Sequence, residues 1–101
     1  MAEPLPVPAG RAALKVLLVE DSRFDAELLT ESLREIDPQA DVMLARDEST
    51  FTEALAAGPY DAILSDYELP GFSGAHALEI ARTLAPHTPF IFVSGVIGED
   101  N

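Results

Sequence analysis

Four short apolar segments recur along the chain from residue 14 onward, separated by longer segments with helical spacing. The first is continuous and rich in Val and Leu, as expected of a strand that is covered on both faces by helices. The second is more amphipathic, and the third and fourth end in a polar residue. We predict strands over residues 14–20, 41–46, 62–66 and 90–94.

The three intervening segments carry apolar residues at helical spacing, with a capping residue before each and a breaker after each. In the first of them Ala26, Leu29, Leu33 and Ile36 would lie on one face. The expected N-caps are Ser22, Ser49 or Thr50, and Ser73, and the expected stops are Pro38, Gly58 with Pro59, and Pro86. The sequence therefore predicts three helices between four strands.

Strands that alternate with helices favour right-handed crossovers and a parallel sheet, so we expect an α/β fold. The segment 1–13 contains Pro4, Pro6, Pro8 and Gly10 and has little to bury, so it is predicted to be a disordered tail. Residues 14–101 are predicted to form one domain. The 101 residues suffice for a single core but leave little surplus.

Charge narrows the classes of partner. The net charge of -12 disfavours binding to nucleic acid or to anionic membranes, which would repel the chain, and favours cations and basic partners. There is no cysteine, so disulfides and thiolate metal sites are excluded. No apolar run is long enough to cross a bilayer. We expect a soluble, cytoplasmic protein.

Acidic residues follow two of the predicted strands at the same edge of the sheet. Glu20 and Asp21 end the first strand, Asp66 ends the third, and Ser94 ends the fourth. Ligands of open α/β sheets bind beyond the carboxyl ends of the strands. Crowded carboxylates repel one another, so such a cluster indicates a hard cation or a residue that is chemically modified.

Each of these residues also has a purely structural interpretation. Glu20 and Asp21 would then be a solvated strand end with a helix cap, Asp66 a turn residue, and Ser94 a hydroxyl bonded to its own backbone. Their occurrence together favours a site.

The two histidines have no partner at metal-ligand spacing, and we expect His76 to be exposed on a helix and His87 to lie in a loop.

Three motifs in chain order make this sequence resemble the receiver domain of two-component response regulators. They are Leu17-Leu18-Val19-Glu20-Asp21-Ser22, then Ser65-Asp66-Tyr67-Glu68-Leu69-Pro70-Gly71 with Gly74 beyond, and Phe92-Val93-Ser94-Gly95. The resemblance covers Leu14 to Gly98. It implies a doubly wound parallel sheet of flavodoxin-like strand order 2-1-3-4.

The resemblance also implies a role for each site residue. Asp66 matches the phosphoacceptor, which would receive a phosphoryl group from a histidine kinase or a phosphotransfer protein. Asp21 matches the acid that binds Mg²⁺ directly, Glu20 the acid that holds it through water, and Glu68 the residue whose backbone carbonyl is a further ligand. Ser94 matches the hydroxyl that hydrogen-bonds the phosphoryl group. Such a domain is a signalling protein rather than an enzyme.

The chain departs from the family at its C-terminal end. A receiver has a fifth strand with a lysine, followed by a helix, whereas this sequence ends at Asn101 and its only lysine is Lys15. We expect it to be the N-terminal part of a longer protein; otherwise it completes its sheet with another copy. In either case the apolar strand over 90–93 is predicted to self-associate through its free edge.

Two other functions compete with the phosphoacceptor. One is an interaction or dimerisation module of the same fold that is never phosphorylated, which the absent lysine favours. The other is a Mg²⁺-dependent phosphohydrolase with an aspartyl-phosphate intermediate. That class places its nucleophile and a second acid two residues apart after the first strand, and the segment 19–23 lacks this pattern.

Overall fold

A parallel sheet forms the centre of the computed structural model, which describes residues 13–67, 69 and 71–93. Its strands are β1 (Lys15–Val19), β2 (Asp41–Ala45), β3 (Ala62–Asp66) and β4 (Phe90–Val93). They pair in the order β2-β1-β3-β4, and every pairing is parallel. The α/β class and the strand order 2-1-3-4 are thereby confirmed.

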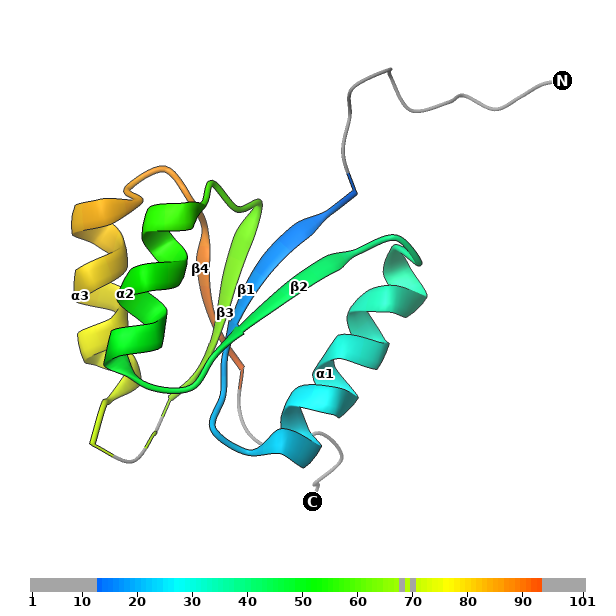
Figure 1. The fold of residues 1–101 in the computed structure, drawn as a ribbon, viewed down its shortest axis with the longest axis horizontal. Helices are drawn as coiled ribbons and strands as arrows, with labels where there is room; N and C mark the ends of the chain where they lie inside the picture. Colours follow the sequence, from blue (N-terminus) through cyan, green and yellow to red (C-terminus); the bar gives the residue numbers. More distant parts are fainter. Residues whose placement is uncertain (1–12, 68, 70, 94–101) are drawn as a thin grey trace, which may run out of the picture.

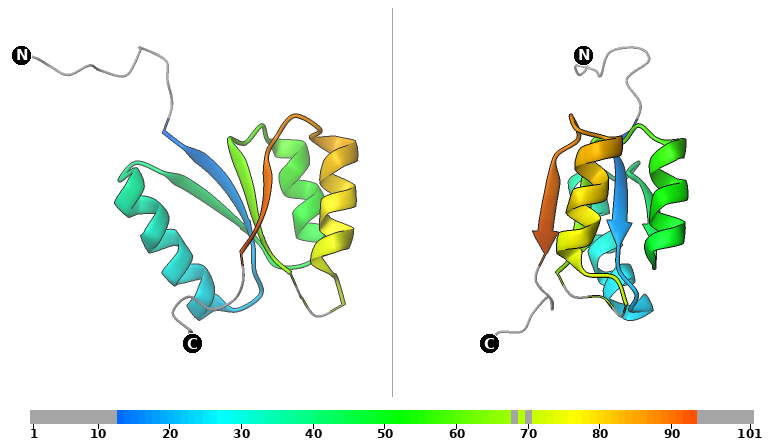
Figure 2. Two further views of the ribbon diagram at one scale, coloured as in Figure 1. Left: turned by 180° about the vertical axis from the view of Figure 1, so that it is seen from behind. Right: turned by 90° about the vertical axis from the view of Figure 1, so that its left-hand side faces the viewer.

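Helices cover both faces of this sheet. They are α1 (Arg23–Ile36), α2 (Glu48–Ala57) and α3 (Gly74–Leu84). Helix α1 lies on one face, and α2 and α3 lie side by side on the other (Figures 1 and 2). Among the described residues, no helix has the length and apolar character needed to cross a membrane.

The first and third helices begin at the predicted caps. The hydroxyl oxygen of Ser22 accepts a hydrogen bond from the amide of Asp25 at 3.2 Å, and that of Ser73 accepts one from the amide of His76 at 3.1 Å. In each case the side chain satisfies an amide that has no partner within the helix.

The predicted cap of the second helix was wrong. Neither Ser49 nor Thr50 precedes the helix, because α2 begins earlier, at Glu48, and Asp47 is its N-cap. The Asp47 carboxylate accepts from the Thr50 amide at 2.9 Å, and the Thr50 hydroxyl accepts from the Asp47 amide at 3.1 Å. This reciprocal capping box satisfies two amides at once, which stabilises the helix start at this position.

The core lies mainly between the sheet and the pair α2 and α3. There Leu17 and Ile63 from the strands pack in one cluster with Phe51 from α2, and all three are fully buried. On the opposite face, Val16 and Leu18 of β1 are also buried. Burial on both faces explains the continuous apolar run of the first strand.

The α1 face is less completely buried. Ala26 is buried and Leu29 and Leu33 are partly buried, but Ile36, expected on the same face, is 76% exposed at the last residue of the helix. Strand β4 lies at one edge of the described sheet, with Ile91 and Phe92 exposed. Self-association through this edge stays a prediction.

Several predictions fall on residues that are not described. The tail is described only at Ala13, and the fourth strand is described as far as Val93. Glu68, Ser94 and Gly95 lie outside the described residues.

Candidate functional site

The ends of β1 and β3 bring the predicted acids together. Val19, the last residue of β1, is paired with Ser65 of β3, so the next residues along the chain, Glu20 and Asp66, lie side by side just beyond the β1–β3 pairing. The Glu20 amide donates to the carbonyl of Ala45 at 3.0 Å and so extends the pairing with β2 by one residue.

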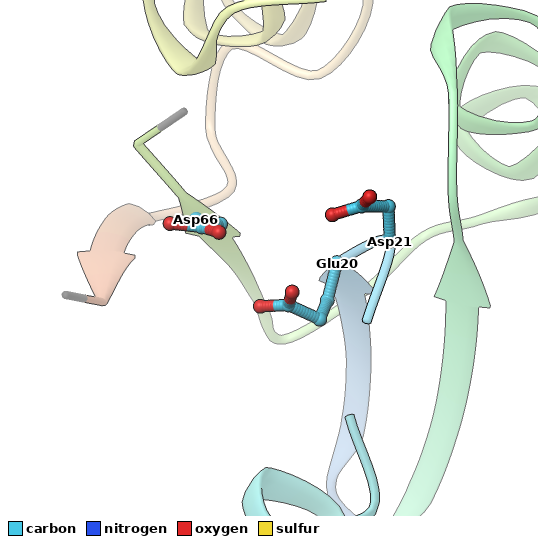
Figure 3. Close-up of side chains that lie close together, drawn as sticks. All are labelled: Glu20, Asp21 and Asp66. Atoms are coloured by element: carbon cyan, nitrogen blue, oxygen red, sulfur yellow. The ribbon is translucent and has the colours of Figure 1, made fainter. Parts of the chain in front are cut away.

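Three carboxylates converge at this edge. Glu20, Asp21 and Asp66 each offer an oxygen atom, and these atoms all lie within 4.8 Å of one another. Figure 3 shows the side chains of Glu20 and Asp21 extending from the end of β1 toward Asp66. Glu20 is buried, Asp66 is partly buried and Asp21 is exposed. The predicted convergence of these acids is confirmed.

The negative charge of Glu20 is disfavoured at this cluster, because the residue is only 4% exposed and lies beside other acids. Burial raises the pKa of Glu20 above its ordinary value of 4.5, and the negative charges of Asp66, Asp25 and Asp21 raise it further. A hydrogen bond from the Ser22 amide to Glu20 Oε2, at 3.1 Å, acts in the opposite direction. One amide does not offset burial and three like charges, so a cation would relieve the strain.

Asp25 was not among the predicted site residues. It lies in the first turn of α1, four residues after Asp21, and its charge acts on Glu20. In the sequence, the only indication of this role was that Asp25 lies near the predicted start of a helix and close to Asp21. Acidic residues are common at helix N-termini because they interact favourably with the helix dipole, so this position does not by itself indicate a site.

The donor set suits a hard divalent cation such as Mg²⁺. All three donors are carboxylate oxygens, and the exposed side at Asp21 leaves room for the several waters that Mg²⁺ retains. Among the described residues this is the only group of three or more metal-ligating side chains so close together. The predicted carbonyl ligand of Glu68 and the hydroxyl of Ser94 lie outside the described residues.

The backbone at Asp66 is held from both sides. The side chain of Ser65 is fully buried, and its hydroxyl donates to the Asp66 carbonyl at 2.8 Å. The amide of Gly74, at the start of α3, donates to the Tyr67 carbonyl at 2.8 Å. No role was predicted for Ser65 from the sequence. The only feature that could have indicated one was the presence of a polar residue inside a strand predicted to be buried.

The histidines lie outside this site. His76 is exposed on α3 and His87 is exposed in a loop, as predicted. His76 nevertheless has partners: its Nε2 lies 3.3 Å from Glu48 Oε2, and its Nδ1 lies 3.9 Å from Glu79 Oε1. The contact with Glu48 joins α3 to α2, so no local spacing in the sequence could indicate it.

Comparison with known proteins assigns a family to this arrangement. Residues 16–101 match the family model described as the response regulator receiver domain. The chain is 32% identical over 87 residues to the transcription factor SKN7 of Saccharomyces cerevisiae, and 33% identical over 82 residues to the response regulator protein FleR of Pseudomonas aeruginosa. These matches cover 86% and 81% of this chain but only 14% and 17% of the relatives.

Solved structures share the fold. The receiver domain of the sensor histidine kinase PA1611 from Pseudomonas aeruginosa, solved with a magnesium ion in its active site cleft, superposes with a TM-score of 0.71 and 29% identity. The match covers 80% of this chain and 66% of that one. The response regulator TrrA from Thermotoga maritima, solved with Mg²⁺ and BeF, gives a TM-score of 0.73 and 25% identity, covering 82% and 70%.

Proposed function

The chain belongs to the family of response regulator receiver domains, and from this premise we propose that Asp66 accepts a phosphoryl group in a Mg²⁺-dependent reaction. The observation that carries the proposal is the convergence of Glu20, Asp21 and Asp66 within 4.8 Å. The magnesium ion in the related PA1611 receiver domain supports the same choice of metal. This domain would act as a signalling switch and not as an enzyme.

In the proposed reaction, a carboxylate oxygen of Asp66 attacks the phosphorus of a phosphohistidine. A phosphorus–oxygen bond forms, the phosphorus–nitrogen bond breaks, and the leaving imidazole nitrogen takes up a proton. Asp21 would hold Mg²⁺ directly, Glu20 through a water, and the Glu68 carbonyl would complete the protein ligands. The bound ion would neutralise charge on the phosphoryl oxygens.

The partners follow from this role. A sensor histidine kinase or a phosphotransfer protein would supply the phosphoryl group and would dock beside the N-terminal turn of α1. Ser94 would hydrogen-bond the transferred group. Because nearby acids surround the site and the net charge is -12, binding of nucleic acid by this domain is disfavoured. We place the protein in the cytoplasm, where sensor kinases present their histidine.

The test is phosphorylation of the purified chain by a small phosphodonor such as acetyl phosphate. With Mg²⁺ present, intact mass should increase by one phosphoryl group, stable in acid and labile in base. Asp66→Asn should abolish the increase, whereas Asp61→Asn should not. Asp61 is a suitable control because it precedes β3 at the opposite end of the strand. Equal incorporation without Mg²⁺, or in Asp66→Asn, would refute the assignment.

A second candidate is a receiver-like interaction module that is never phosphorylated. The exposed edge of β4, where Ile91 is 47% and Phe92 38% exposed, favours it, since such an edge can pair with another chain. Self-association through that edge would occur with either function. A chain that forms oligomers at micromolar concentration but gains no phosphoryl group would fit this alternative.

A further inference from the structure

The residue directly after the proposed phosphoacceptor makes an unusual contact for an exposed side chain. Tyr67 is 58% exposed, yet its ring meets the ring of Phe92 on β4 edge to face, with centroids 5.1 Å apart and an interplanar angle of 71°. Phe92 in turn contacts Phe90 at 5.3 Å. Edge-to-face geometry is the favoured arrangement of two aromatic rings, so the contact has a defined orientation.

The backbone of Tyr67 is constrained as well. Its carbonyl accepts from the amide of Gly74 at 2.8 Å. A Cβ atom placed on Gly74 would lie 2.7 Å from Phe92 Cε1, 2.7 Å from the Tyr67 carbonyl oxygen and 2.8 Å from the Asp66 carbonyl oxygen. The end of β3, the start of α3 and the Phe92 ring therefore meet with no spare volume.

This junction bears directly on the acid cluster. Asp66 is the last residue of β3, so ladder pairing holds the chain before it, and Tyr67 determines the direction in which the chain continues. A ring anchored on Phe92 restricts the backbone dihedral angles on either side of the peptide between Asp66 and Tyr67. The Asp66 carboxylate is then kept within reach of Glu20 and Asp21, where a cation needs it.

We propose that Tyr67 is a positioning residue for the cation site, and that it acts through its ring contact with Phe92. The inference rests on the proposed function to the extent that it assumes a divalent cation at the three acids. The phenolic hydroxyl has no part in it, because the ring alone makes the contact. A phenylalanine at position 67 should therefore serve as well as tyrosine.

The experiment measures the Mg²⁺ dissociation constant of the full chain by titration calorimetry. The variants are Tyr67→Phe, Tyr67→Ala, Phe92→Leu and the double variant Tyr67→Ala with Phe92→Leu. Ile91→Ala is the matched control, since Ile91 neighbours Phe92 on β4 and its side chain points to the opposite face of the sheet. Leucine at position 92 retains an apolar side chain at the edge and removes only the ring.

We expect Tyr67→Phe and Ile91→Ala to bind Mg²⁺ like the unchanged chain. Tyr67→Ala and Phe92→Leu should each bind on the order of tenfold more weakly, as is typical when a residue that orients a metal ligand is removed. The double variant should be no weaker than the weaker single variant, because both changes break one contact. Metal-free melting temperatures, measured in parallel, separate lost positioning from lost folding.

Intrinsic tyrosine fluorescence gives a second readout. The chain has no tryptophan and two tyrosines. Tyr60 is buried, its hydroxyl donates to the Ala54 carbonyl at 2.8 Å, and it precedes β3, whereas Asp66 ends that strand. We expect Mg²⁺ to change the tyrosine emission of the unchanged chain, and to change that of Phe92→Leu by a different amount. In Tyr67→Phe, which lacks the tyrosine beside the site, Mg²⁺ should leave the emission nearly unchanged.

Two results would overturn the inference: an unchanged Mg²⁺ affinity in Tyr67→Ala, or losses in the two single variants that add in the double variant. If the unchanged chain binds Mg²⁺ and Asp66→Asn does not, such a failure leaves the proposed function standing. If the unchanged chain binds no Mg²⁺ at all, the proposed function and this inference fail together.

Discussion

Carboxylate oxygens of Glu20 and Asp66 lie within 4.8 Å of each other, although Glu20 directly follows β1, Asp66 ends β3, and a helix, a further strand and a second helix lie between them in the chain. They meet because β1 and β3 are adjacent and parallel, so their carboxyl ends reach the same edge of the sheet. Their mutual repulsion is the physical basis for the expected cation binding.

Adding Mg²⁺ should stabilise the folded chain. At a free concentration ten times the dissociation constant, the gain in unfolding free energy is about 1.4 kcal/mol. Thermal denaturation should show it as a higher melting temperature that EDTA reverses. Asp21→Asn should remove most of the shift, whereas Glu27→Gln, which changes an exposed acid on α1, should retain it. An equal shift with KCl at matched ionic strength would indicate screening in place of binding.

Glu20 should make the metal-free protein less stable as the pH rises. Its folded pKa is raised by burial above the ordinary 4.5, so the folded state holds this proton more tightly than the unfolded state does. Its contribution to stability is complete below 4.5 and is lost as the pH rises through the folded pKa. In EDTA, Glu20→Gln should therefore become more stable relative to the unchanged chain as the pH increases from 4 to 7.

Melting curves of the two proteins over this pH range provide the measurement. The difference between them isolates Glu20 from the other acids, which both proteins share. A constant difference at all pH values would mean that the folded pKa of Glu20 is not raised.

Gly74→Ala should destabilise the chain by about 1–3 kcal/mol, the usual cost of forcing extra volume into a packed site. The added methyl group would meet two backbone carbonyls and the Phe92 ring at 2.7–2.8 Å. Gly71→Ala should also destabilise the chain, but through backbone conformation and not through crowding, because Gly71 has φ 67° and open space around an added Cβ. Holding an alanine in this left-handed conformation should cost about 1–2 kcal/mol. Urea denaturation measures both; an unchanged midpoint for Gly74→Ala would contradict the close approach.

Asp47→Ala should lower the melting temperature, because it leaves the Thr50 amide without its cap. Asp47→Asn retains an acceptor and should lower it less. The pKa of Asp47 is lowered from 3.8, chiefly by the hydrogen bond from the Thr50 amide, so its charge stabilises the fold above pH 3.8 and this gain is lost as the pH falls through the lowered pKa. Ser49→Ala, at the cap predicted from sequence, should have little effect on melting.

The elements of this fold could be predicted from sequence because each depends on nearby residues. Apolar runs of strand length, Ser22 and Ser73 as caps, and the stop at Gly58 are local features, and the structure agrees with them. The predicted second cap was wrong because several adjacent residues can cap a helix. Here Asp47 is the cap, through its reciprocal hydrogen bonds with Thr50.

The sequence by itself determined that acids would follow the first and third strands, since that is a matter of order along the chain. The adjacency of β1 and β3 was expected from the family resemblance and not from any residue pattern. Only the tertiary structure decided that Asp25 adds its charge to Glu20 and that Tyr67 meets Phe92. The reason is physical. Strand order and side-chain contacts arise when separate elements pack together, and the energy of that packing is not encoded in any one stretch of residues.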